Sequence, residues 1–364
     1  MVPASLPTPG NALVYVRIVI LLDQDAVMTA LKTVQDPELH RDIVSLNMVR
    51  DLKVEGGRVA FSLVLTTPAC PLRETIDHDV REALEGIGGV EEIDIDWGAE
   101  VRSTFREGGP TPIPGVRNVI AVASNKGGVG KSTVAVNLAV ALGRLGARVG
   151  LLDADITGPN IPTMLGIQGG LQASGQQGLS PVEAHGIKAV SLGFVVPPGT
   201  PVVWRGPMIG SGVRQLMHDV DWGDLDYLII DLPPGTSDAS MSMAAEALIA
   251  GTVIVSTPSK VSIEDARKAV GMFDRLGVPI FGVVENMSSD VFGRGGAREA
   301  ADELGVEFLG EIPLDVTVRE GGDVGVPVVV GHPESPQTAA FIELAEQVAA
   351  RCSVLQFAGE AGTR

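Results

Sequence analysis

The sequence predicts an α/β protein in which a doubly wound, mostly parallel sheet is preceded by a small α+β domain. Three observations support this prediction. Short apolar runs alternate with helical patterns along most of the 364-residue chain. The run at residues 228–230 is apolar on both faces, as a sheet covered by helices on each side requires. A glycine-rich segment at residues 126–133 lies between a predicted strand and a predicted helix.

The first part of the chain has its own order of elements. Apolar spacing and turn residues predict a helix, two strands around a Gly-Gly turn, a helix that starts with proline, and a third strand, at residues 25–34, 51–54, 58–65, 71–84 and 90–95. This α-β-β-α-β order predicts a small α+β domain over residues 24–103.

Residues 104–117 are predicted to link this domain to the next one. They contain the sequence Glu-Gly-Gly-Pro-Thr-Pro-Ile-Pro-Gly, which has no apolar periodicity and several residues that interrupt regular structure. The second domain is therefore expected over residues 118–351. Its helices are predicted to start at Lys131 and Ser262, and its strands at residues 119–123, 149–153, 227–231, 252–256 and 280–285.

The composition favours a cytoplasmic protein that binds neither nucleic acid nor a membrane. A formal net charge of -18, with no basic run, would repel a phosphate backbone. Cys70 and Cys352 are too few for a disulfide framework, which indicates a reducing compartment. The apolar stretch at residues 12–22 is too short to span a bilayer and lacks the features of an export signal. Residues 1–22 are expected to be a loose extension or the result of a misassigned gene start.

The glycine-rich segment predicts a loop that binds nucleotide phosphates, made of Lys126, Gly127, Gly128, Val129, Gly130, Lys131, Ser132 and Thr133. Glycines let consecutive backbone N–H groups turn toward an anion, and the helix that follows adds its positive N-terminal end. Lys131 is expected to reach the β- and γ-phosphates of ATP, and the Ser132 hydroxyl is expected to bind Mg²⁺. The alternative is a glycine-rich turn followed by an unrelated Lys-Ser pair.

Polar residues follow three of the predicted strands, at the edge where ligands of open α/β sheets bind. Asp153 and Asp155 follow one strand, so that one can orient a water molecule and the other can assist a metal ion. Asp231 ends another strand and is expected to hold Mg²⁺ through water, although any of these aspartates could instead cap a turn. Asn286 offers a donor and an acceptor to an adenine edge, unless it is only a turn residue.

The phosphate loop departs from the common G-x-x-x-x-G-K-S/T pattern, because Asn125 replaces the first glycine and Lys126 follows it. This K-G-G-x-x-G-K-S/T form resembles the ATPases that include MinD and ParA. In that family the extra lysine reaches the partner's nucleotide, so the resemblance implies a nucleotide-sandwich homodimer in which Lys126 and Lys131 both act in catalysis. It also implies that Asp155 positions or activates the attacking water, supported by Asp153. Lys126 could otherwise be a solvated loop lysine.

Further motifs resemble the Mrp/ApbC/Nbp35 group of iron-sulfur cluster carrier ATPases over residues 25–351. In the second domain they are the loop at Lys126 and the sequences LDADITGPN, VWRGPM, DYLIIDLPPGT and REGG, at residues 152–160, 203–208, 226–236 and 319–322. The first domain contributes Asp-Pro-Glu and Thr-Thr-Pro-Ala-Cys-Pro-Leu, at residues 36–38 and 66–72. These resemble the MIP18-type (DUF59) module that is often fused to such ATPases, although Asp-Pro-Glu could be only a turn.

One feature of this group is missing. Its members carry a C-x-x-C pair after the Glu-Asn-Met-Ser segment, and the dimer holds a 4Fe-4S cluster between two such pairs. Here the segment runs into Ser289 and Asp290, so a cluster held by four cysteines at this place is excluded. Cys70 is then the thiol expected to bind iron or a cluster, because Pro71 would open a helix whose dipole lowers the thiol pKa. A buried, inert thiol is the alternative, and Cys352 is expected at the end of a C-terminal helix.

The leading hypothesis is an ATP-binding and ATP-hydrolysing iron-sulfur cluster carrier or assembly factor that acts as a nucleotide-dependent homodimer. It would use Mg²⁺ and have iron-sulfur scaffold and acceptor proteins as partners. A second hypothesis is a MinD/ParA-like positioning ATPase, although residues 355–364 form neither a strongly basic nor a clearly helical tail. A third is a regulatory ATPase that has lost cluster chemistry and binds partners through its first domain.

Overall fold

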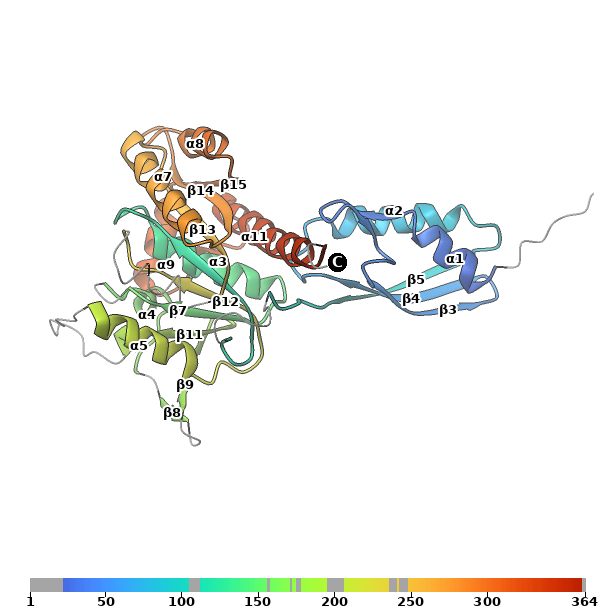
Figure 1. Cartoon of the computed structure of the whole chain (residues 1–364), viewed down its shortest axis with the longest axis horizontal. Helices are drawn as coiled ribbons and strands as arrows, with labels where there is room; N and C mark the ends of the chain where they lie inside the picture. Colours follow the sequence, from blue (N-terminus) through green and yellow to red (C-terminus); the bar gives the residue numbers. More distant parts are fainter. Residues whose placement is uncertain are drawn as a thin grey trace, which may run out of the picture.

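The computed structural model describes residues 22–104, 112–155, 158–170, 172–174, 178–194, 206–235, 241 and 248–361. Several features predicted above lie outside the described residues: residues 1–21 of the extension, residues 105–111 of the linker, and parts of three motifs, at residues 156–157, 203–205 and 236. The described elements form an N-terminal module and a larger sheet domain, which lie next to each other along the long axis of the molecule (Figure 1).

The N-terminal module is a three-stranded sheet with the order β3-β4-β5, and two helices cover one of its faces (Figure 1). The first two strands form the predicted antiparallel hairpin, and β5 pairs in parallel with β4. Helix α2 begins two residues later than predicted, because Leu72 is its N-cap. The elements are α1 (Gln24–Leu31), β1 (Gln35–Asp36), β2 (Arg41–Asp42), β3 (Val49–Glu55), β4 (Arg58–Leu65), α2 (Arg73–Glu85) and β5 (Glu92–Ala99).

The larger domain is built on an eight-stranded sheet with the order β10-β11-β7-β12-β6-β13-β14-β15. All neighbouring strands are parallel except β10, which pairs antiparallel at one edge. The mostly parallel sheet predicted from the sequence is therefore confirmed. Its strands are β6 (Val116–Ala123), β7 (Val149–Asp153), β10 (Val182–Ala184), β11 (Ile187–Ser191), β12 (Leu225–Asp231), β13 (Ile249–Ser256), β14 (Ile280–Ser288) and β15 (Phe308–Pro313).

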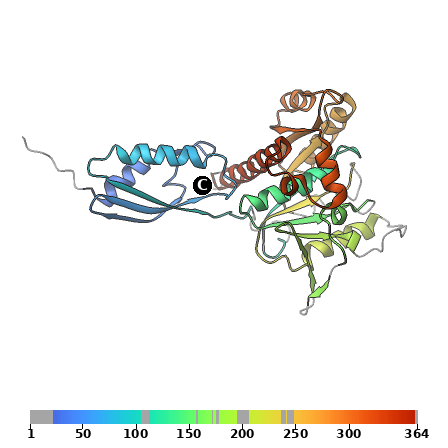
Figure 2. The same cartoon turned by 180° about the vertical axis from the view of Figure 1, so that it is seen from behind.

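Helices cover both faces of this sheet (Figures 1 and 2). One apolar core lies between the sheet and α3, α10 and α11, and the other lies between the sheet and α5, α7 and α8. The helices are α3 (Lys131–Arg144), α4 (Ile161–Met164), α5 (Gly206–His218), α7 (Lys260–Arg275), α8 (Gly296–Leu304), α9 (Val316–Val324), α10 (Val328–Gly331) and α11 (Pro336–Ala361). Two short strands, β8 (Gln172–Ser174) and β9 (Gly178–Ser180), form a separate hairpin.

The C-terminal helix α11 joins the two parts of the molecule (Figure 2). Near its end, Phe357 belongs to the apolar core of the N-terminal module. Gln356 Nε2 donates hydrogen bonds to the Arg102 carbonyl at 2.8 Å and to Asn118 Oδ1 at 2.9 Å. These contacts hold the chain in a helix to Ala361, so the expectations that Cys352 ends the helix and that the tail is not helical are wrong. None of the helices in the described part is both long and apolar enough to cross a membrane.

The loop before α2 makes a second joint between the two parts. Thr67 is buried, and its Oγ1 accepts a hydrogen bond of 3.0 Å from the Tyr227 hydroxyl. Pro68 lies against Gly146, and Ala69 belongs to a core of the larger domain. Gly146 precedes β7, and Tyr227 lies near the start of β12. This joint is therefore at the amino ends of the parallel strands, opposite to the end where the glycine-rich loop lies.

Truncation of Phe357 is expected to weaken the joint that α11 makes. Its side chain is 7% exposed, so Phe357→Ala should lower the free energy of unfolding by about 3 kcal/mol through lost burial and a cavity. Phe292→Ala is the matched control, because Phe292 is 45% exposed and should change stability by less than about 1 kcal/mol. Urea denaturation without nucleotide measures both variants. Equal stabilities would contradict this account of the joint.

Candidate functional site

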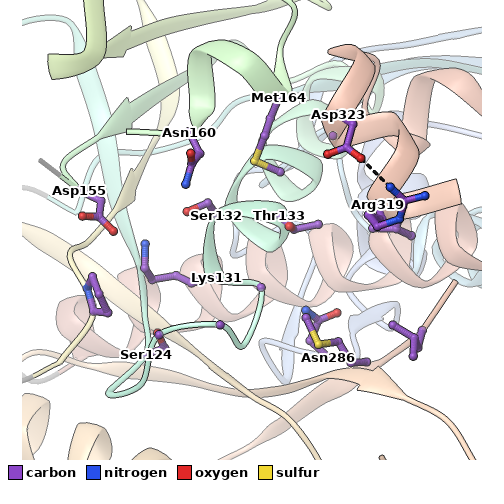
Figure 3. A pocket seen from close by; sticks show the side chains of 18 of the residues that line it. Ser124, Lys131, Ser132, Thr133, Asp155, Asn160, Met164, Asn286, Arg319 and Asp323 are labelled. Atoms are coloured by element: carbon purple, nitrogen blue, oxygen red, sulfur yellow. Dashed lines mark hydrogen bonds and ion pairs between the residues drawn. The ribbon is translucent and has the colours of Figure 1, made fainter. Parts of the chain in front are cut away.

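The glycine-rich segment forms a loop between β6 and α3, at the carboxyl ends of the parallel strands (Figure 3). Gly128 and Gly130 have φ angles of 80° and 83°, a region in which a side chain would be strained. A Cβ added to Gly127 or Gly128 would meet nothing within 4 Å, so this stretch of backbone faces open space. Since α3 starts directly at Lys131, the free N–H groups and positive end of this helix are available to an anion.

A buried ion pair lies beneath the loop. Asp231 is fully buried at the end of β12, and its Oδ1 lies 2.5 Å from Lys131 Nζ. Its Oδ2 accepts a hydrogen bond of 2.5 Å from the Ser132 hydroxyl. Burial raises the pKa of Asp231, and the adjacent ammonium opposes this shift. The structure thus places a carboxylate and a hydroxyl, oxygen ligands of the kind that Mg²⁺ takes, beside the lysine expected to bind phosphate.

Asp153 and Asp155 have different positions. Asp153 is the register partner of Asp231 on the adjacent strand and is buried. It accepts hydrogen bonds from the Ser191 hydroxyl at 2.9 Å and from the Asp155 N–H at 3.1 Å. Burial, followed by the charge of Asp231, raises the pKa of Asp153 to about 7. Asp155 is half-buried and is the one of the two that lines a cavity, and Asp153 holds the backbone that carries it.

The phosphate loop and Asp155 line one end of a cavity of about 490 Å³ (Figure 3). Met164, Leu314 and Val318 contribute apolar side chains to its lining. Arg319 also lines the cavity, on the side away from Asp155, and pairs with Asp323 at 2.7 Å (Figure 3). A lining that combines apolar walls with a few polar groups suits a nucleotide whose phosphates lie on the loop.

Asn286 contacts the loop itself. It is 5% exposed at the end of β14, and its Nδ2 donates a hydrogen bond of 2.8 Å to the Val129 carbonyl. One of the two N–H donors of the Asn286 amide is therefore used within the protein in this structure. The predicted adenine contact would use the other N–H or the amide oxygen of Asn286.

Asn160 is a cavity residue that the sequence reasoning did not select. It is the N-cap residue of α4, but its side chain caps no N–H group there and lines the cavity instead (Figure 3). The signal that could have identified it is its position at the end of the motif that begins with Asp153 and Asp155. Met164 and Arg319 also line the cavity, and only the fold brings them to it.

Lys126 is exposed and lines the mouth of the cavity. The Ser124 hydroxyl donates a hydrogen bond of 3.0 Å to its carbonyl, which holds the loop backbone. Among the residues that the structure describes, no carboxylate forms an ion pair with the Lys126 ammonium.

Cys70 lies at the joint between the two parts, away from this cavity. It is half-buried and precedes Leu72, the N-cap of α2, by two residues. Burial raises the pKa of Cys70 to about 11, and the carboxylates of Glu38, Asp36 and Glu346 add to this shift against a hydrogen bond from the Leu72 N–H. The expectation that the helix lowers this pKa is wrong, because desolvation and three nearby carboxylates outweigh the N-terminal end of α2.

The place of the missing C-x-x-C pair is a tight turn. Ser289 and Gly293 exchange backbone hydrogen bonds of 3.0 and 2.8 Å. Between them, Val291 and Phe292 are 84% and 45% exposed. The remaining thiol, Cys352, is 1% exposed within α11, and burial raises its pKa to about 12. The turn at residues 289–293 has no cysteine, and Cys352 is too buried to bind a cluster.

Two family models match this chain. The model described as NUBPL iron-transfer P-loop NTPase matches residues 115–349, and the model described as iron-sulfur cluster assembly protein matches residues 24–95. The iron-sulfur cluster carrier protein of Synechocystis sp. is 50% identical over 349 residues, which cover 92% of this chain and 99% of that protein. The iron-sulfur cluster carrier protein of Escherichia coli is 37% identical over 336 residues, or 89% of this chain and 91% of that protein.

Solved structures show the same nucleotide-binding fold. A nucleotide-binding protein from Archaeoglobus fulgidus, in complex with ADP, is 37% identical with a TM-score of 0.55, covering 63% of this chain and 93% of that chain. The cell division ATPase MinD of Pyrococcus furiosus is 26% identical with a TM-score of 0.50, covering 64% and 98%. The resemblances inferred from the phosphate loop and from the motifs of both domains are confirmed.

Glu38 is expected to make stability depend on pH at the joint beside Cys70. Burial and then Asp36 raise the pKa of Glu38 from 4.5 to about 7, against the attraction of Arg351. Between these pH values the folded protein keeps a proton that the unfolded chain has released, so stability falls as the pH rises. Glu38→Gln should make this fall smaller.

Urea denaturation at pH values from 4.5 to about 7 measures the effect. Glu74→Gln, at the start of α2, is the control and should follow the wild-type curve. A Glu38→Gln curve that is parallel to the wild-type curve would show that Glu38 does not titrate in this range.

Proposed function

Because the chain belongs to the family of NUBPL-type iron-transfer P-loop NTPases, we propose that it is an ATP-hydrolysing iron-sulfur cluster carrier or assembly factor that acts as a nucleotide-dependent homodimer. The observation that supports ATP chemistry most directly is the buried contact of Asp231 with Lys131 and Ser132, at the base of a cavity of suitable size. The iron-sulfur part rests on similarity over both domains to proteins named iron-sulfur cluster carriers.

The site suits phosphoryl transfer, which requires mainly positioning and charge neutralisation. The Ser132 hydroxyl and the Asp231 carboxylate are oxygen ligands that fit Mg²⁺. Ser132 would bind the ion directly and Asp231 through water, and the ion would neutralise phosphate charge. Lys131 would exchange its contact with Asp231 for the β- and γ-phosphates. Asp155 would position the attacking water, while Asp153 keeps the Asp155 backbone in place.

A second copy of the chain would complete this site. Lys126 is exposed at the cavity mouth, where it can reach outward to the nucleotide of a facing copy. Exposed apolar side chains lie along the same edge of the sheet, on segments that follow β13, β14 and β15: Val261, Val291, Phe292, Leu314 and Val316. Burial of these side chains would favour association through this edge, with the same surface used by both copies.

Iron or a cluster is the proposed cargo, and Cys70 is the thiol that would bind it. Cys70 lies at the amino ends of the strands, whereas Lys126 lies at their carboxyl ends. In a dimer whose two chains face each other at Lys126, the two Cys70 thiols would therefore be far apart. Each Cys70 would bind cargo with nearby carboxylates, such as Glu38, or with ligands from a scaffold or acceptor protein, and binding would release the thiol proton.

Scaffold and acceptor proteins of iron-sulfur assembly are the proposed partners, and the cytoplasm is the proposed location. The N-terminal module is the part of the chain that is proposed to bind these proteins. This module matches the iron-sulfur cluster assembly model. The raised pKa of Cys70 favours one alternative, a regulatory ATPase that has lost cluster binding and keeps partner binding through this module.

Lys126→Ala tests the homodimer. With ATP and Mg²⁺, the wild type should sediment as a dimer and the variant as a monomer, because the lysine that contacts the facing nucleotide is removed. ATP turnover should fall by about 100-fold or more, as for other cations supplied in trans, while ATP affinity per chain stays within about threefold. Analytical ultracentrifugation and steady-state kinetics measure these effects.

Lys32→Ala is the control, since Lys32 is exposed at the end of α1, and it should behave as wild type. A dimer that forms equally well without Lys126 would rule out the proposed role of this lysine.

Cys70→Ser tests the cargo site. Protein purified anaerobically and loaded with iron and sulfide should lose bound iron in Cys70→Ser but not in Cys352→Ser, because Cys352 is buried within α11. Iron analysis, Mössbauer spectroscopy and transfer to an acceptor apoprotein are the measurements. If wild type hydrolyses ATP but binds no iron, the carrier function fails and the regulatory alternative stands.

A further inference from the structure

Met287 has an unusual backbone conformation beside the phosphate loop. Its φ angle is 62°, in the left-handed region that a methionine rarely occupies. The pairing of β14 with β15 shifts at the same place: Asn286 pairs with Ile312, and Ser288 pairs with Pro313. Met287 is therefore an extra residue, a β-bulge, at the end of β14. Left-handed non-glycine residues of this kind persist where the surrounding structure over-determines them, which is common at functional sites.

The bulge brings two consecutive side chains to the loop. In a regular strand, neighbouring side chains point to opposite faces of the sheet. Here Asn286 and Met287 both line the cavity, and Asn286 Nδ2 is bonded to the Val129 carbonyl. A Cβ added to Gly130 would lie 2.2 Å from Asn286 Nδ2 and 3.2 Å from Met287 Cε. The two side chains thus pack against successive loop residues, Val129 and Gly130.

These contacts fix the end of the loop that leads into α3. Gly130 is the N-cap residue of this helix, so its position determines where the first two helical residues, Lys131 and Ser132, lie. Gly127 and Gly128, by contrast, face open space. The loop is therefore held from the side of β14 at Val129 and Gly130, immediately before the lysine that the reaction needs.

We propose that Met287 is a positioning residue for ATP hydrolysis, whose left-handed bulge and thioether side chain hold Gly130 so that Lys131 meets the transferred phosphoryl group. Nucleotide binding is shared among many N–H groups of the loop, so a small shift of Gly130 costs little affinity. Charge on the phosphoryl oxygens must be met at a defined place in the transition state. Loss of the Met287 contact should therefore lower kcat more than it raises KM.

Met287→Gly separates backbone strain from side-chain contact. Glycine adopts the left-handed conformation without strain but leaves nothing to pack against Gly130. We expect kcat to fall about tenfold and KM for ATP to stay within about threefold. Tm should change little, because relief of the left-handed strain offsets the lost side-chain packing and the greater freedom of glycine in the unfolded chain. Met287→Leu keeps an apolar side chain of similar volume and should retain most of kcat.

Asp51→Gly is the matched control. Asp51 has a φ angle of 54° and lies at a register shift between β3 and β4, exposed on the N-terminal module, so its replacement should leave kcat unchanged. Wild-type kcat in Met287→Gly would overturn the proposal. A fall in kcat that is matched by a fall in Tm would also overturn it, because Met287 would then serve stability alone.

Discussion

The contact of Asp231 with Lys131 and Ser132 is the interaction on which the nucleotide site depends. It ties the end of β12 to the first turn of α3, in the centre of the sheet. A fully buried carboxylate is costly unless it is paired and hydrogen-bonded, and here an ammonium and a hydroxyl meet both needs. The groups that satisfy Asp231 are also those that a magnesium nucleotide requires. Ligand binding would therefore replace an internal contact within a site that is already assembled.

The nucleotide cavity lies at the carboxyl ends of the parallel strands, and Cys70 lies near their amino ends. Helix α3 runs from the phosphate loop to the chain near Gly146, which lies against Pro68. Strand β12 runs from Tyr227, bonded to Thr67, to the buried carboxylate at its other end. These packed elements connect the cavity to the loop that carries Cys70.

The sequence predicted the elements that have a clear pattern of apolar residues within a short stretch of chain. Strands such as β12 are apolar on both faces because helices cover both sides of the sheet, and this signal is visible in a short run of residues. The antiparallel β10 and the short helix α4 carry too few residues to show a period. The continuation of α11 beyond Cys352 depends on residues distant in the sequence. Phe357 packs into the core of the N-terminal module, and Gln356 bonds Arg102 and Asn118.

By itself, the sequence determined the chemistry of the site: a phosphate loop, the lysine and serine that follow it, acids at the ends of strands, and too few cysteines for the usual cluster. These features are local, because the turn, the helix start and the strand end involve neighbouring residues. Only the tertiary structure decided that Asp155 faces the cavity while Asp153 is buried, that Asn286 holds the loop, and that Cys70 has a raised pKa. Burial and electrostatic environment decided these points, and both depend on side chains that folding brings together from distant parts of the chain.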